Sequence, residues 1–251
     1  MNEPRPASEM PSGLREALEH KVDKQPLVDW IFTRVADKYD LGNDIMSLGW
    51  HTRWKRRMVE YAAIQPGDRV LDIACGTGDT SFMVGGIATE GEVVGTDINA
   101  DMMRLAEVKR PPGMDHVRFV LADAGSLPFE DASFDKVTCT YAGRGFPDWV
   151  AVLREVHRVL VPGGTFWNLD FARPPSAFVD WGYRTWLTGS GAVLGTVLHG
   201  HPKTYIYIPE SMRAYKGQRW LRDRMVEVGF EAGLEETFLG LMAYNSGTKP
   251  E

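Results

Sequence analysis

The sequence predicts an α/β fold built around a doubly wound, mostly parallel sheet of seven strands, and three observations lead to this prediction. The chain has 251 residues, 43% of them hydrophobic, which is enough for one sizeable domain. A turn of small residues follows the first apolar run, and sheets of this class bind ligands at such turns beyond the carboxyl ends of their strands. Apolar, β-rich runs alternate with helical patterns, as in parallel sheets. The five runs expected to be parallel strands are Val70–Ala74, Val93–Asp97, Val117–Ala122, Lys136–Thr140 and Thr165–Phe171.

Helical patterns fill the intervals between these runs and continue after them. Pro162-Gly163-Gly164 predicts a tight turn that leads into the fifth strand. Two further β-like runs reach to Tyr244 and should complete the sheet, with at least one of them antiparallel to it. The helices expected in this region are Asp79–Ile87, Asn99–Lys109, Trp149–Leu160 and Gln218–Val228.

Before the first strand, the sequence predicts a leader and then helices. Residues 1–25 should be a flexible leader, because they begin polar and rich in proline, and residues 26–251 a single domain. Apolar residues recur at helical spacing between 27 and 35, and a second helix is expected over Trp50–Ala62. Together, residues 26–65 are predicted to form an N-terminal helical lid.

Composition and charge exclude several classes of protein. The net charge is −6 with no long basic run, so we expect no binding to nucleic acid. The short basic run Arg53–Arg57 predicts a solvated helix face, with contact to anionic lipid as the alternative. The two cysteines, Cys75 and Cys139, have no metal-ligand spacing and imply no disulfide, so we expect no metal and a reducing cytoplasm. No apolar run is long enough to span a membrane, and no signal peptide is recognisable.

The turn after the first strand predicts a cofactor site. Gly76 and Gly78 let the backbone approach a ligand closely, and Asp72 places negative charge near it. That charge suits S-adenosyl-L-methionine, which carries an ammonium and a sulfonium. The rival interpretation is a dinucleotide, because Gly76 to Ser81 nearly match the nucleotide-binding fingerprint. A pyrophosphate would be repelled by Asp72 and Asp79, which favours the methyl donor.

Polar residues at the ends of the following strands support this interpretation. Asp97 should accept hydrogen bonds from a ribose, Ile98 should pack against the adenine base, and Asp123-Ala124 should meet the adenine amino group. The residues from Thr140 to Asp148 end the fourth strand at the same edge. Each carboxylate could instead be a helix cap or a turn residue.

Longer motifs identify a family. The segment Tyr39–Trp54 (YDLGNDIMSLGWHTRW), together with Asp123–Phe129, Arg158–Gly164 and Tyr205–Arg213, resembles the ubiquinone/menaquinone biosynthesis C-methyltransferases, within the Rossmann-like class I S-adenosylmethionine-dependent methyltransferases. The resemblance covers about residues 32–245. It implies methyl transfer to a ring carbon of a polyprenylated quinol, in menaquinone or ubiquinone biosynthesis. It also implies that Thr77, Asp97, Asp123-Ala124 and Thr140 contact the methyl donor.

Some positions depart from the family pattern, and they leave the acceptor open. After the fourth strand the family usually has Phe-Gly-Leu/Ile-Arg-Asn, where this chain has Tyr141-Ala142-Gly143-Arg144-Gly145. Its Glu-x-Ser after the fifth strand is replaced by Asp170-Phe171-Ala172, and a His-containing stretch by Met242–Asn245. The acceptor is therefore a lipoquinol or another hydrophobic phenol. A catalytically idle, cofactor-sensing protein is disfavoured, because the residues of the turn are intact.

Catalysis requires deprotonation of a phenol, and the pKa of a phenol is about 10. We expect Arg144 to stabilise the phenolate, with a surface salt bridge as the alternative role. His51 and Asp148 are candidate proton acceptors, although His51 could be a packed residue and Asp148 a helix cap. The residues expected on the substrate side are Tyr39, Asn43, Tyr141 and Asp170.

A segment after the fifth strand suits a hydrophobic acceptor. Residues 172–210, rich in Trp, Tyr, Leu and Gly, predict a helical insertion, in which Gly189, Gly191 and Gly195 make a pliable apolar wall for an isoprenoid tail. The alternatives are a helical layer over the core or a homodimer face. Loose contact with a membrane surface is also expected, because lipoquinones reside in membranes.

Overall fold

The computed structural model describes residues 44, 45, 47, 49–199, 205 and 207–251. The predicted leader and the predicted helix at residues 27–35 lie outside these residues, as do Tyr39 and Asn43. The second predicted helix is α4, which spans Trp50–Ala62 as expected.

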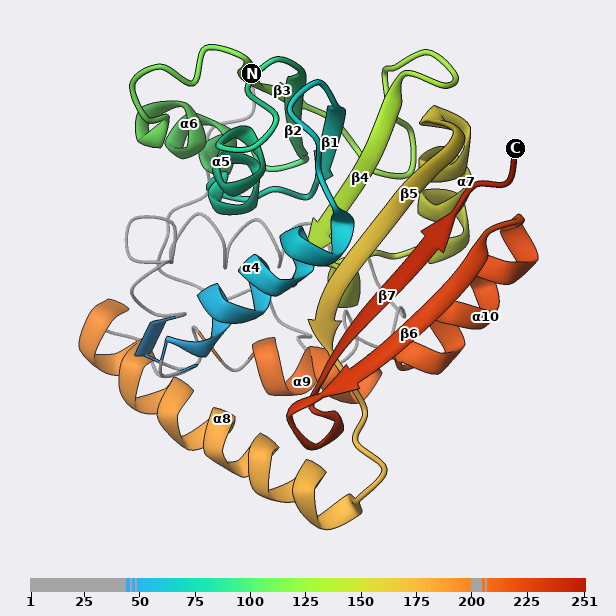
Figure 1. Cartoon of the computed structure of the whole chain (residues 1–251). Helices are drawn as coiled ribbons and strands as arrows, with labels where there is room; N and C mark the ends of the chain where they lie inside the picture. The colour runs from blue at the N-terminus through green and yellow to red at the C-terminus, as the bar shows by residue number, and fades with distance from the viewer. Residues whose placement is uncertain (1–43, 46, 48, 200–204, 206) are drawn as a thin grey trace, which may run out of the picture.

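The described residues form a sheet of seven strands in the order β3-β2-β1-β4-β5-β7-β6 (Figure 1). β1 to β5 are parallel to one another, and β7 is antiparallel to both β5 and β6. This confirms the predicted fold class and the antiparallel strand near the C-terminus. The strands are β1 (Arg69–Ile73), β2 (Glu92–Asp97), β3 (Val117–Leu121), β4 (Phe134–Thr140), β5 (Leu160–Phe171), β6 (Glu231–Thr237) and β7 (Met242–Thr248).

Helices cover both faces of this sheet. Val70 packs in a buried cluster with residues of α4 and α5, whereas its neighbour Leu71 packs in a cluster with residues of α7 and α10. Because both faces are buried, the strands appear in the sequence as continuous apolar runs. The remaining helices are α5 (Asp79–Gly85), α6 (Ala100–Lys109), α7 (Trp149–Val159), α8 (Ala177–His199), α9 (Tyr207–Ala214) and α10 (Gln218–Val228), with short 3-10 turns η2 (Gly143–Gly145) and η3 (Phe238–Gly240).

The predicted turn before the fifth strand is wrong in one respect. β5 begins at Leu160, and Pro162-Gly163-Gly164 form an irregularity inside it, where the register against β4 shifts. Gly163 adopts a φ of 76° and donates its N–H to the carbonyl of Lys249 at 2.8 Å. The strand therefore continues through the turn residues because the chain near the C-terminus supplies a hydrogen-bond partner.

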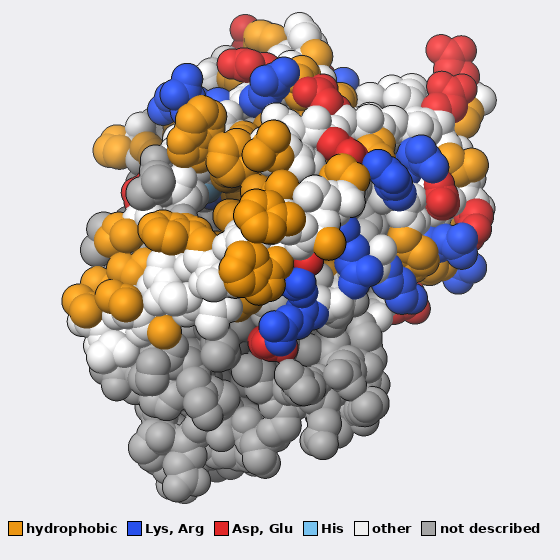
Figure 2. Space-filling view, turned by 90° about the horizontal axis from the view of Figure 1, so that it is seen from below, with side chains coloured by type: hydrophobic (Ala, Val, Ile, Leu, Met, Phe, Trp, Pro, Cys, Tyr) orange, Lys and Arg blue, Asp and Glu red, His pale blue; other side chains and the backbone are white. Residues whose placement is uncertain are grey.

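The described part of the predicted insertion contains the helices α8 and α9, and its glycines do not interrupt α8. α8 runs without a break through Gly189, Gly191 and Gly195, and α9 follows it. Hydrophobic side chains gather on the face of the molecule that Figure 2 shows from below, with Lys and Arg side chains beside them. Exposed apolar residues of α4, α8 and η3 are Trp50, Phe178, Trp181, Trp186, Val193, Val197, Phe238 and Leu239. Among the helices of the described residues, none is both long and apolar enough to cross a membrane.

The packing of β2 against β3 generates a stability prediction. A Cβ at Gly95 would lie 2.6 Å from Phe119 Cδ1 and 2.9 Å from Cys75 Sγ. Gly95→Ala should therefore lower the free energy of unfolding by about 1–3 kcal/mol, measured by urea denaturation. Gly67→Ala is the matched control, because a Cβ at Gly67 meets no atom within 4 Å. Equal stability of the two variants would contradict the prediction.

Candidate functional site

The candidate site lies at the carboxyl ends of β1 and β4. The chain leaves β1 towards β2 and leaves β4 towards β5, so the strand order reverses between them, and open α/β sheets bind ligands at such a point. Ala74, directly after β1, has a φ of 50°, and Tyr141, directly after β4, has a φ of 59°. Left-handed backbone is strained for residues other than glycine, and such strain clusters at functional sites. No sequence signal revealed the strain at Ala74.

The two glycines of the turn after β1 have different surroundings. Gly76 has a φ of 57° and donates its N–H to Asp97 Oδ2 at 3.0 Å, and a Cβ there would meet no atom within 4 Å. A Cβ at Gly78, in contrast, would lie 2.9 Å from Phe119 and 3.0 Å from Phe82. The open space is therefore beside Gly76, and Gly78 allows α5 to begin close to the sheet.

Asp72 is fully buried below this turn. Its carboxylate accepts hydrogen bonds from the hydroxyls of Ser81, at 2.7 Å, and Thr138, at 2.8 Å. Burial raises the pKa of Asp72 from 3.8 to about 6, and the two hydroxyls oppose this shift. Both oxygens of Asp72 thus hold α5 and β4 against β1, and the charge lies beneath the turn.

The ends of β2 and β3 carry the residues predicted to meet an adenosine. Asp97 ends β2, and its carboxylate lies at the turn through the bond to Gly76. Ile98 follows it and is 46% exposed, so its side chain offers an apolar surface at the edge of the sheet. Beyond β3, Asp123 is exposed and accepts from a backbone N–H at 2.8 Å, and Ala124 is buried. The structure brings these predicted residues to one edge.

A lysine that the sequence analysis assigned to a solvated helix face is buried at this site. Lys55 is 7% exposed and donates to Asp79 Oδ2 at 3.2 Å. Lys109 donates to Asp79 Oδ1 at 2.8 Å and to the buried Thr77 hydroxyl at 3.1 Å. Burial raises the pKa of Asp79, but the two lysines outweigh it and lower that pKa overall. The signal that could have indicated the burial of Lys55 is that positions along a helix alternate between buried and exposed within the run Arg53–Arg57.

Residues at the end of β4 connect the sheet to α4 and α5. The hydroxyls of Thr140 and Thr80 are 2.9 Å apart. The Tyr141 hydroxyl donates to the carbonyl of His51 at 3.4 Å, so this residue joins the end of β4 to α4. The His51 ring is buried, with its Nδ1 2.9 Å from the Ser47 hydroxyl. The predicted proton acceptor His51 is therefore close to the predicted substrate residue Tyr141.

Arg144 and Asp170 form a buried ion pair. The Arg144 Nε donates to Asp170 Oδ1 at 2.7 Å, and its backbone N–H donates to Oδ2 at 3.1 Å. Its Nη1 donates to the Ser211 hydroxyl at 2.8 Å, and its guanidinium lies 4.3 Å from the ring centroid of Phe171. Both side chains are less than a tenth exposed. The alternative of a surface salt bridge is wrong, because the pair lies inside the protein between η2, β5 and α9.

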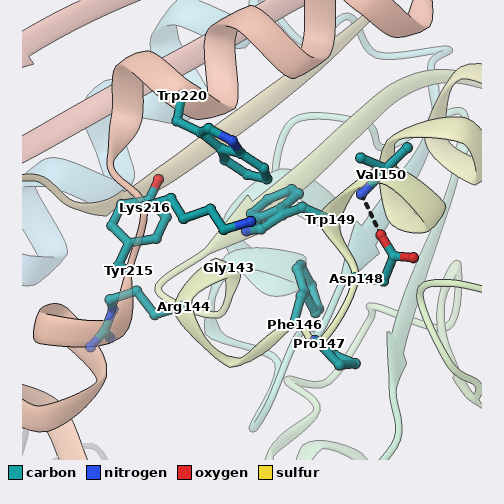
Figure 3. Close-up of a pocket in the computed structure, with 10 residues that line it drawn as sticks. All are labelled: Gly143, Arg144, Phe146, Pro147, Asp148, Trp149, Val150, Tyr215, Lys216 and Trp220. Atoms are coloured by element: carbon teal, nitrogen blue, oxygen red, sulfur yellow. Dashed lines mark hydrogen bonds between the residues drawn. The ribbon is translucent and has the colours of Figure 1, made fainter. Parts of the chain in front are cut away.

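Asp148 caps α7. Its Oδ1 accepts from the backbone N–H of Val150 at 2.9 Å (Figure 3). It also accepts from the backbone N–H of Ala151 at 3.1 Å. The cap role that the sequence allowed is therefore present, and a role in proton transfer stays a prediction. Tyr39 and Asn43 lie outside the described residues. Among the described residues, no group of three or more His, Cys, Asp or Glu could hold a metal ion.

The arrangement fits S-adenosylmethionine in three respects. Space beside Gly76 lets a ligand approach the backbone, and a side chain at that position would fill it. The Asp97 carboxylate stands where it can accept from a ribose diol. The exposed Ile98 provides an apolar contact for a flat base.

The sequence matches proteins of known family. Residues 19–249 match the model of the ubiE/COQ5 methyltransferase family. The demethylmenaquinone methyltransferase of Thermus thermophilus is 37% identical over 220 residues, which cover 88% of this chain and all of that protein. The ubiquinone/menaquinone biosynthesis C-methyltransferase UbiE of Pseudomonas paraeruginosa is 35% identical over 256 residues, covering all of both chains.

The fold also matches solved structures. A SAM-dependent methyltransferase from Aquifex aeolicus superposes with a TM-score of 0.58 at 14% identity, covering 77% of this chain and 88% of that one. A SAM-dependent methyltransferase from Methanosarcina mazei gives a TM-score of 0.54 at 23% identity, covering 76% of this chain and 97% of that one. At these identities the likeness concerns the fold.

The burial of Asp72 predicts a pH-dependent stability. The unfolded chain loses the Asp72 proton near pH 3.8 and the folded protein keeps it to about pH 6, so stability falls as the pH rises through this interval. The free energy of unfolding falls by about 3 kcal/mol, because each unit of difference in pKa between the folded and unfolded states corresponds to about 1.4 kcal/mol. Relative to Asp72→Asn, wild type should lose this amount between those two pH values, measured by urea denaturation. A constant difference between the two proteins would contradict the prediction.

Proposed function

Because this chain belongs to the ubiE/COQ5 methyltransferase family, we propose that it transfers a methyl group from S-adenosylmethionine to a ring carbon of a polyprenylated quinol. The family match over residues 19–249 carries this proposal, supported by curated relatives named for demethylmenaquinone and for ubiquinone/menaquinone biosynthesis. Membership of a methyltransferase family also disfavours the alternative of a dinucleotide at the Gly76 turn. Another hydrophobic phenol stays the alternative acceptor, because of the departures at Gly145 and Ala172.

The residues that would hold the cofactor lie at the ends of four strands, β1 to β4. The proposed set is Asp72, Gly76, Thr77, Gly78, Asp97, Ile98, Asp123, Ala124 and Thr140. Asp97 and Ile98 would hold the ribose and the base, and Asp72 would support the turn from below. To this set we add Lys55, because the methionine part ends in a carboxylate and Lys55 is a buried ammonium at the same turn.

The protein must also prepare the acceptor. S-adenosylmethionine supplies an electrophilic methyl group on a positively charged sulfur, and this methyl replaces the proton of a ring carbon. Loss of a phenol proton makes that carbon nucleophilic, so a nearby cation lowers the barrier. We assign this role to Arg144, held rigidly by Asp170 and Ser211. Asp148 and His51 are the proposed proton acceptors, and Tyr39, Asn43, Tyr141 and Asp170 the substrate-side residues.

The apolar insertion fits a lipid-like acceptor. The exposed aromatic and aliphatic side chains of α8 suit an isoprenoid tail or the surface of a membrane. We propose a cytoplasmic protein that contacts that surface loosely, with a homodimer through the same face as the alternative. The two described cysteines are free, which agrees with a reducing compartment.

A turnover assay tests the proposed function. The purified protein is incubated with S-adenosylmethionine and either a reduced demethylmenaquinol or a methoxy-benzoquinol, and the products are read by mass spectrometry. Gain of one CH₂ on either ring supports the proposal and identifies the acceptor. Absence of any gain, with cofactor binding intact by calorimetry, would favour another phenolic acceptor.

Lys55 should distinguish two forms of the cofactor. Lys55→Met should weaken the binding of S-adenosylmethionine about 10–100-fold, because a charge-assisted hydrogen bond is lost. Binding of decarboxylated S-adenosylmethionine should change little, since that ligand lacks the group that Lys55 contacts. Both are measured by calorimetry, with Arg56→Met as the control because Arg56 is exposed on the same helix. Equal loss for both ligands would contradict the assignment.

Substitution of Arg144 should lower kcat more than it changes the binding of the acceptor. Arg144→Lys keeps the charge but loses the planar fork, and kcat should fall about 10²–10³-fold with a smaller change in KM. Ser211→Ala, which removes the hydrogen bond to Nη1, should have a weaker effect on kcat. Thermal melts of both variants separate turnover from folding. Unchanged kcat in Arg144→Lys would remove Arg144 from the mechanism and leave the cofactor assignment in place.

A further inference from the structure

The turn between β6 and β7 presents two apolar side chains on strained backbone. Phe238 and Leu239, both in η3, have φ values of 51° and 60°, in the left-handed region that bulky residues rarely adopt. Turns that need this backbone usually carry asparagine or glycine. Leu239 is 76% exposed, so its side chain gains little packing that would offset the strain. Such strain clusters at functional sites, and here it holds apolar side chains outside the protein.

The start of α4 packs against this turn and adds a third exposed apolar side chain. Trp50 is 42% exposed and Phe238 is 44% exposed, and their ring centroids are 5.9 Å apart. Both rings also contact the buried ring of Trp54, at centroid distances of 6.1 and 5.4 Å. Trp54 therefore supports both exposed rings, and Leu239 follows directly in the chain. Together, these side chains of α4 and η3 form one apolar surface.

Two exposed arginines of α4 stand beside this apolar surface. Arg53 follows Trp50 by three positions, and its Cζ lies 5.0 Å from the ring centroid of Trp50. Arg56 lies three positions further along the helix, and neither arginine forms an ion pair with any residue that the structure describes. Glu60 is the one acidic residue of α4, against four basic residues. Although the whole chain carries a net charge of −6, this end of α4 is therefore locally basic.

The outer face of α8 lies at the same end of the molecule. In Figure 1, α8 and the turn between β6 and β7 both lie at the lower end, and Figure 2 shows hydrophobic side chains there with Lys and Arg beside them. The acidic and basic residues of α8 are Asp180 and Arg184, which form an ion pair at 2.6 Å. The hydroxyls of Thr185, Thr188 and Thr196 each donate to a backbone carbonyl of α8 itself. Apart from that one ion pair, α8 thus continues the apolar end of the molecule with uncharged side chains.

We propose that the α4–η3 patch, which consists of Trp50, Arg53, Arg56, Phe238 and Leu239, docks on an anionic lipid bilayer. The apolar side chains enter the boundary between headgroups and acyl chains, and the two guanidinium groups bind lipid phosphates. Charge favours this occupant over a second copy of the chain, because a symmetric dimer through the patch would place arginines opposite arginines. The inference rests on the membrane contact proposed above, and it adds a defined anchor and a defined class of lipid.

Flotation of the full-length protein with lipid vesicles tests the charge of the partner. Phosphatidylcholine vesicles that contain about 30% phosphatidylglycerol should bind the protein about tenfold more tightly than pure phosphatidylcholine vesicles, and added salt should remove most of this difference. Arg53→Gln and Arg56→Gln should each weaken binding to the anionic vesicles about fivefold. Arg104→Gln is the matched control, because it makes the same change of charge at an exposed position of α6, at the opposite end of the molecule in Figure 1. It should leave binding unchanged.

Substitution of Leu239 separates a membrane anchor from a structural residue. Leu239→Asn should weaken binding to the anionic vesicles about tenfold or more, because an apolar side chain is lost from the bilayer. Its melting temperature should equal or exceed that of wild type, because asparagine adopts left-handed backbone more readily than leucine. Val108→Asn on α6 is the control, since Val108 is 75% exposed, and it should not change vesicle binding.

Four results would overturn the proposal. A lower melting temperature of Leu239→Asn would show that this side chain packs within the protein, and unchanged vesicle binding would remove it from the anchor. Equal binding of wild type to both kinds of vesicle, or no binding to either, would exclude an anionic bilayer as the partner. A dimer in lipid-free sedimentation that Leu239→Asn dissociates would identify a second copy as the occupant. The proposed methyl transfer is tested separately, because turnover of a short-tailed quinol in solution needs no membrane.

Discussion

The buried ion pair of Arg144 and Asp170 joins three separate elements of this molecule, β5, η2 and α9. Asp170 lies near the end of β5, Arg144 lies in η2 directly beyond β4, and Ser211 joins them from α9. Removal of one partner from such a pair leaves an uncompensated buried charge, at a cost of about 3–5 kcal/mol. The pair is thus the means by which the insertion after β5 is held against the end of the parallel sheet.

Four carboxylates at this edge of the sheet differ in their side-chain or backbone partners. Asp72 accepts from hydroxyls, Asp79 from ammonium groups, Asp97 from a backbone N–H, and Asp170 from a guanidinium. Burial among neutral partners raises the pKa of Asp72, whereas the two lysines lower that of Asp79. The sequence shows only that acidic residues follow the strands. Which of them faces a ligand depends on partners that are far away in the chain.

The fold was predictable because burial on both faces leaves apolar runs that local pattern reveals. All five predicted parallel strands, the helix bounds of α4 and α10 and the cap at Asp148 follow from such local signals. Lys55 was misassigned because a basic run suggests solvent, and only the partner Asp79, 24 positions later, explains its burial. The left-handed backbone of Ala74 and Tyr141 has no local signal, because neither residue type favours it. The early start of β5 involves partners far away in the chain, Phe134 opposite Leu160 and Lys249 bonded to Gly163.

The glycine at position 143 lets η2 pack closely on both of its sides. A Cβ there would lie 2.2 Å from Trp149 Cζ2 and 3.2 Å from Asp170 Oδ2. The backbone of η2 therefore lies directly between the ion pair, which belongs to the proposed active site, and the Trp149 indole at the start of α7. A contact this close leaves no side chain to absorb a displacement, since packed interiors transmit shifts rather than yielding to them. A side chain at position 143 would therefore displace either the Trp149 ring or η2, and η2 carries the backbone N–H through which Arg144 also contacts Asp170.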